Sequence, residues 1–149
     1  MAYITREEVT GAVGGVDKLV QYTDDNDTGE VDWTVVDRAI AYATGKFESS
    51  ARARYSLPVP LTEMVRQTCL DLATFQLIRR RATITEGIYD VARQAHDDAI
   101  KFLDKLQIGK AALDVAAEAE TTSNPASPDR VLSGPRRKSD FTDEKLRNF

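Results

Sequence analysis

The sequence predicts an all-α fold: a small bundle of three long helices, preceded by short N-terminal helices and followed by an extended C-terminal tail. Along three stretches, apolar residues recur at steps of three and four, the spacing of one face of a helix. Residues that cap helices precede all three stretches (Asp32, Thr62 and Thr83), and another, Thr5, precedes a shorter one. After about residue 113 the chain becomes polar and proline-containing, which is typical of a segment outside a core.

The length and composition limit the classes of protein to which the chain can belong. With 149 residues the chain is long enough for one domain, and a net charge of −4 with a pI near 5.1 argues against a dedicated nucleic-acid binder. The single cysteine, Cys69, cannot form an intrachain disulfide. Acidic residues stand where a signal peptide would be apolar, and no uncharged run approaches the ~18 residues of a membrane span, so we expect the protein to be cytosolic when made.

The N-terminal part is expected to form two short helical pieces. Thr5-x-x-Glu8 is a capping-box pattern, in which each side chain satisfies a backbone amide of the first turn. Glycines interrupt this helix at positions 11, 14 and 15, and a second apolar cluster follows at Val16, Leu19 and Val20. An acidic loop then leads to Asp32.

Asp32 is the predicted N-cap of the first long helix, which runs to about Arg54. The prolines at 58 and 60 end it and set an extended link. Thr62 is the predicted N-cap of the second long helix, which is apolar on two sides and should therefore lie centrally. It ends in the basic run Arg79–Arg81, which suits the negative end of the helix dipole.

The third long helix should begin at a second capping box, Thr83-x-x-Glu86. Gly109 is a candidate C-cap or kink, and alanine and glutamate favour further helix over 111–120. Its predicted inner stripe is Ile88, Val91, Ala95, Ala99, Phe102 and Leu106. The predicted core of the whole bundle comprises Val36, Ile40, Phe47, Val65, Cys69, Leu72, Val91, Ala95 and Phe102.

These patterns divide the chain into a helical body (1–113), a polar linker (114–135) and a C-terminal docking tail (136–149). The tail carries a basic cluster followed by spaced apolar residues: Arg136, Arg137, Lys138, Phe141, Leu146 and Phe149. Apolar anchors on a polar tether are typical of segments that order on a partner, and we favour docking over an inert tail.

Four groups are candidates for chemistry or binding. The loop Asp24–Asp32 follows the first nine positions of an EF-hand, but Val35 stands where the bidentate glutamate belongs, so a solvated turn is the favoured interpretation. His96 lacks a nucleophile, and Cys69 lies on an apolar face, so both are interpreted as structural. Arg79–Arg81 is interpreted as a solvated helix end, a contact to an acidic neighbour or a phosphate contact. We therefore predict no enzymatic activity, no cofactor and no metal site.

In order and spacing, the residues resemble a family. The opening Met1-Ala2-Tyr3-Ile4-Thr5, the junction Arg54-Tyr55-x-Leu57-Pro58 and the helix segment Cys69-x-x-Leu72-Ala73 are similar to those of the Mu-like phage head–tail connector (adaptor) proteins. Ile108-Gly109-Lys110 and the ending from Asp140 to Phe149 are also similar. The resemblance covers nearly the whole chain.

The resemblance implies a virion protein of the neck, between capsid and tail. Its subunits would form a ring, expected to be a dodecamer, beneath the portal protein and above a stopper or tail protein. DNA would pass through this ring without specific binding, since acidic walls repel phosphates. The alternative is a small helical DNA-binding regulatory protein, and a third possibility is an enzyme or calcium sensor.

Overall fold

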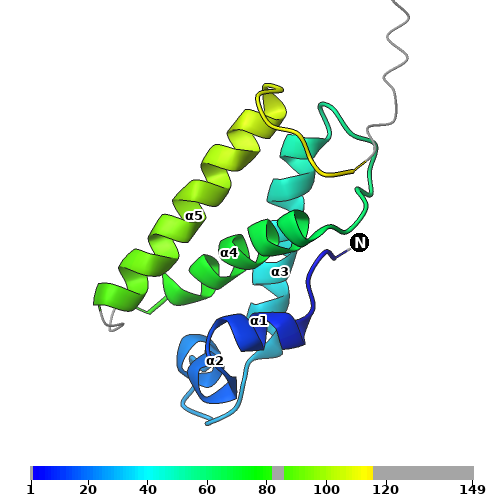
Figure 1. Ribbon diagram of the computed structural model, residues 1–149. Helices are drawn as coiled ribbons and strands as arrows, with labels where there is room; N and C mark the ends of the chain where they lie inside the picture. Colours follow the sequence, from blue (N-terminus) through cyan, green and yellow to red (C-terminus); the bar gives the residue numbers. More distant parts are fainter. Residues whose placement is uncertain (1, 82–85, 116–149) are drawn as a thin grey trace, which may run out of the picture. The chain divides into compact units, whose positions relative to one another are not determined.

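The computed structural model describes residues 2–81 and 86–115, and in these ranges the protein is all-α, which confirms the predicted fold class (Figure 1). The five helices are α1 (Arg6–Ala12), α2 (Val16–Thr23), α3 (Trp33–Ala51), α4 (Glu63–Ile78) and α5 (Glu86–Gln107). No helix among these is long and apolar enough to cross a membrane.

The chain divides into two units, residues 1–118 and 119–149. The second unit lies wholly outside the described residues, as do most of the linker 114–135 and the docking tail 136–149. Thr83, the N-cap expected for the third long helix, also lies outside them.

The two short helices form as the capping pattern predicts, but Gly11, expected to interrupt the first of them, lies within α1. The Glu8 carboxylate accepts a hydrogen bond from the Thr5 amide at 2.7 Å, and the Thr5 hydroxyl accepts one from the Glu8 amide at 3.3 Å. α1 continues through Gly11, and the break comes at Gly14 and Gly15, whose φ angles of +94° and +107° favour glycine. The chain therefore turns between α1 and α2 where side chains would be strained.

α3 contributes the largest fully buried side chain, Phe47. Its N-cap is Asp32, whose carboxylate accepts a hydrogen bond from the Thr34 amide at 2.9 Å. The ring of Tyr3 meets Phe47 edge-on, with centroids 5.3 Å apart. The Tyr3 hydroxyl in turn accepts a hydrogen bond from the Val59 amide at 3.1 Å, which ties the N-terminal segment to the link after α3.

α4 is central, as a helix that is apolar on two sides should be. It contacts each of the other four helices, and it lies between α3 and α5 in Figure 1. Its N-cap is Thr62, whose hydroxyl accepts a hydrogen bond from the Val65 amide at 3.4 Å. The buried apolar residues of α4 are Val65, Cys69, Leu72, Ala73, Phe75, Leu77 and Ile78.

The predicted inner stripe of α5 is confirmed only in part. Ala99 and Leu106 are buried as expected, but Val91, expected in the core, is 72% exposed, and Ala95 and Phe102 are only partly buried. Leu103, which stands one position, or about 100° of helix rotation, from Phe102, is fully buried although it was not in the predicted stripe. Among the described residues of this helix, the buried ones all lie in its second half. The contact with the rest of the bundle, and not the spacing alone, therefore decides which apolar residues of α5 are buried.

The end of α5 matches a glycine cap. Gly109 has a φ of +77°, and the amide of Lys110 donates to the carbonyl of Lys105 at 2.8 Å, which closes the last turn. Residues 111–115 are not helical, so the expected resumption of helix does not occur within them. Instead, Leu113 is buried and its amide donates to the Tyr55 hydroxyl at 2.9 Å.

Candidate functional site

An apolar groove runs along the seam between α4 and α5 in the part of the chain that the structure describes; we call it the α4–α5 groove. It consists of two adjoining hollows of about 770 Å³ each. The first lies between the end of α1, α4 and the first half of α5; the second continues along α4 and the second half of α5. Both are lined by Glu63, Gln67, Asp71 and Ala95.

The groove exists because the apolar residues in the first half of α5 are left uncovered, whereas Ala99, Leu103 and Leu106 in its second half are buried. Val91 and Ile88, which is 43% exposed, line the first hollow together with the half-buried Leu70 of α4. Phe102 lines the second hollow, and Met64 of α4 is 47% exposed beside it. A contiguous apolar surface of this kind is typical of an interaction site.

Asp71 lies where the two hollows meet. Its carboxylate accepts one hydrogen bond, from the Gln67 side-chain amide at 2.8 Å, and among the described residues no cation pairs with it. Burial raises the pKa of Asp71 above its ordinary value, and the hydrogen bond from Gln67 only partly offsets this effect. The groove thus holds a half-buried carboxylate without a positive partner.

The rim of the groove is held by charged contacts between α1 and α4. Arg66 pairs with Glu8 at 3.1 Å and also with Glu63. The pKa of Glu8 is lowered, chiefly by the hydrogen bond from the Thr5 amide and also by Arg66. These contacts fix α1 against α4 beside the first hollow.

Replacing Asp71 by asparagine is expected to raise the free energy of unfolding at pH 7, by on the order of 0.5 kcal/mol because solvent screens a half-exposed carboxylate. The folded-state pKa is raised, so ionised Asp71 destabilises the fold at neutral pH, and this penalty disappears as the pH falls below the unfolded value of 3.8. Urea unfolding at pH 7 and near pH 3 measures both effects. Asp104→Asn, at an exposed site on α5, is the control; a destabilised Asp71→Asn at pH 7 would contradict the prediction.

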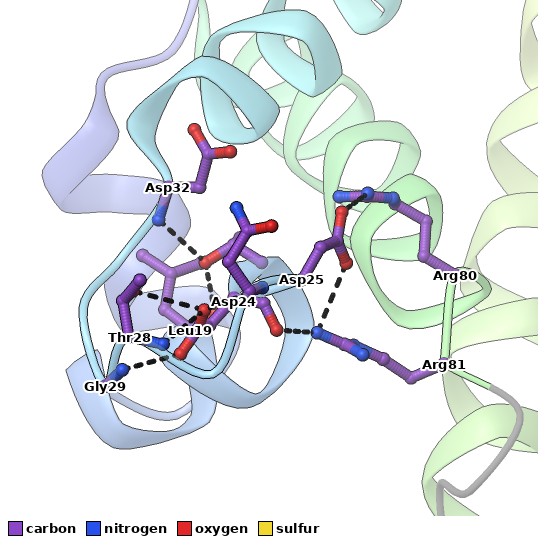
Figure 2. A network of polar contacts seen from close by, with 10 residues as sticks. Leu19, Asp24, Asp25, Thr28, Gly29, Asp32, Arg80 and Arg81 are labelled. Atoms are coloured by element: carbon purple, nitrogen blue, oxygen red, sulfur yellow. Dashed lines mark hydrogen bonds and ion pairs between the residues drawn. The ribbon is translucent and has the colours of Figure 1, made fainter.

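In the acidic loop before α3, the Asp24 carboxylate accepts hydrogen bonds from backbone amides of the same loop (Figure 2). The donors are the amides of Asn26, Thr28 and Gly29, at 3.1, 3.0 and 2.7 Å. These bonds lower the pKa of Asp24. Asp32 is engaged as the cap of α3, so the oxygens that an EF-hand would direct at calcium serve the turn instead. No group of three acidic, histidine or cysteine residues able to hold a metal occurs in the part of the chain that the structure describes.

The arginine run at the end of α4 contacts this loop. Arg80 pairs with Asp25, Arg81 pairs with the same carboxylate at 3.2 Å, and Arg81 also donates to the Asp24 carbonyl (Figure 2). Of the three interpretations of Arg79–Arg81, the contact to an acidic neighbour therefore holds for Arg80 and Arg81. The acidic neighbour is Asp25 of the same chain. The contact fixes the loop after α2 to the end of α4.

Comparison with protein families identifies the chain. The family model described as Bacteriophage Mu, Gp36 matches residues 3–131, a range that includes every described helix. The chain belongs to this family. The match ends before Arg136, so the docking tail and the similar ending from Asp140 lie beyond it. Neither the comparison with curated proteins nor that with solved structures gives a significant match.

In this Gp36-family chain, His96 and Cys69 have structural surroundings. The His96 ring lies against Phe75 with centroids 4.3 Å apart, and its Nδ1 is 3.4 Å from an Asp97 oxygen. Cys69 is fully buried, and burial raises the pKa of its thiol to about 12, which suppresses the reactive thiolate at neutral pH.

The tail residues Arg136, Arg137, Lys138, Phe141, Leu146 and Phe149 lie outside the described residues. The groove was not predicted as a site: Val91 belonged to the apolar stripe assigned to the core, and Asp71 was not singled out. The available signal was an acidic residue between Leu70 and Leu72 in a helix that is apolar on two sides.

Proposed function

We propose that this chain is a non-enzymatic head–tail connector subunit of a tailed phage. Its copies form a closed ring beneath the portal, expected to be a dodecamer, which extends the DNA channel and joins the capsid to the stopper or tail. The observation that carries the proposal is the match of a phage Mu family along the whole helical body.

Two features of the body support this role. A ring needs a surface that makes a head-to-tail contact with the next copy, and the α4–α5 groove offers an open apolar surface for such a contact. The net charge of −4 suits a channel through which DNA passes without sticking. A DNA-binding regulator is less well supported, because Arg80 and Arg81 are engaged by Asp25.

The tail has a part in the same proposal. Arg136, Arg137 and Lys138 would meet an acidic surface, and Phe141, Leu146 and Phe149 would fill apolar pockets, on the portal or on a neighbouring subunit. Each such contact can be weak, because a ring repeats it at high effective concentration.

Co-assembly tests the connector role. Full-length protein is mixed with the portal ring of its own phage and imaged by electron microscopy, beside a version ending at Pro135. We expect the full-length chain to add a second ring below the portal and the shortened chain to fail. A ring with both versions would refute the tail's part only. No ring with either would refute the connector, and a salt-dependent gel shift with phage DNA would then favour the DNA-binding alternative.

A further inference from the structure

The α4–α5 groove has the chemistry of a binding site for a segment that is both apolar and basic. Its walls expose Ile88, Val91 and Met64, and its centre holds the Asp71 carboxylate, which no described cation neutralises. An occupant would have to cover the apolar side chains and bring a positive group to Asp71, since a carboxylate buried further without a partner is costly.

The length of the groove limits the occupant to a short segment. The two hollows extend along α4 from Glu63 to Ile78. At 1.5 Å per residue, this helix of 16 residues is about 24 Å long. An extended chain of eight or nine residues reaches as far, at about 3.3 Å per residue.

The end of this chain fits that description in its sequence. The anchors Phe141, Leu146 and Phe149 span nine residues. The segment 136–149 contains five basic and three acidic residues, whereas the acidic side chains lining the second hollow are Glu63, Asp71, Asp98 and Asp114. The anchor stretch 141–149 therefore matches the groove in length and apolar character, and the whole segment 136–149 is complementary to it in charge.

We propose that the α4–α5 groove of each subunit binds the C-terminal segment 136–149 of the neighbouring subunit in the ring. The apolar anchors cover Ile88 and Val91, and the basic residues between the anchors, Lys145 and Arg147, provide the positive partner for Asp71. This inference rests on the proposed connector function. It assigns the tail's docking site to the neighbouring subunit and not to the portal.

The chain between body and tail is long enough for this exchange. The 20 residues 116–135 can reach at most about 66–72 Å, whereas a domain of about 115 residues has a radius of gyration near 13 Å. The tail can therefore reach the next subunit. A contact passed from each copy to the next is heterologous and closes into a ring, which a contact within one chain cannot do.

Cross-linking between two full-length variants tests the proposal. One variant carries Val91→Cys in the groove, and the other carries Asn148→Cys beside the last anchor; native Cys69 is fully buried and remains in both. Equal amounts are assembled on the portal ring and oxidised mildly. We expect a disulfide-linked dimer with one copy of each variant, at least tenfold more abundant than with Ala41→Cys, an exposed site on α3 outside the groove, in place of Val91→Cys.

The outcomes separate the two proposals. A normal ring in which the Val91→Cys pair cross-links no more than the Ala41→Cys control would overturn the groove inference and leave the connector standing. The groove inference would also be overturned if only a single chain carrying both cysteines cross-links, within itself. Failure to form any ring, with wild-type protein as well, would overturn the connector function and this inference with it.

A second variant tests the charge. Asp71→Asn, expected to stabilise the body, should lower the cross-link yield several-fold, whereas Asp104→Asn should leave it unchanged. A structural role for Asp71 would instead lower stability and yield together. An undiminished yield with Asp71→Asn would overturn the pairing between Asp71 and the basic residues Lys145 and Arg147.

Discussion

Replacing Phe47 by alanine is expected to lower the free energy of unfolding by about 3–5 kcal/mol, the usual cost of removing a buried phenylalanine side chain. Phe47 is fully buried in α3, and its ring also meets that of Tyr3. A loss of this size is a large part of the ~5–15 kcal/mol that stabilises a typical domain. Urea unfolding followed by circular dichroism measures it.

Tyr42→Ala is the matched control, since Tyr42 is an aromatic residue on the same helix but is 41% exposed. It should cost less than about 1 kcal/mol. Equal losses for the two variants would mean that α3 does not present Phe47 to the core.

Leu103→Ala should lower the free energy of unfolding by about 2–5 kcal/mol, whereas Val91→Ala should change it by no more than about 0.5 kcal/mol. Both residues are aliphatic and lie on α5, but Leu103 is fully buried and Val91 is exposed in the groove. The pair therefore tests which apolar residues of α5 are buried in the bundle, those near Leu103 or those near Val91. The same unfolding measurement serves for both variants.

If Val91→Ala were the more costly change, Val91 would be a buried core residue, as the apolar spacing first indicated. This result would also remove the apolar wall of the groove and with it the proposed docking site. Phe102→Ala should cost an intermediate amount, because Phe102 is only partly buried against the core.

The candidate site was only partly visible in the sequence. The apolar character of Ile88 and Val91 was evident, but the same three-and-four spacing describes a core stripe and a binding surface equally well. Asp71 was identified only when its burial, its hydrogen bond to Gln67 and its lack of a cationic partner among the described residues were known together.

The sequence by itself determined the all-α class and the caps at Thr5, Asp32 and Thr62. These features depend on hydrogen bonds between residues two or three positions apart, so a local pattern is sufficient to predict them. The tertiary structure alone decided the facing of α5 and the pairing of Arg80 with Asp25, which are 55 residues apart. Such contacts form only when the helices have packed, because the free energy that selects one stripe over its neighbour comes from burial against a partner helix.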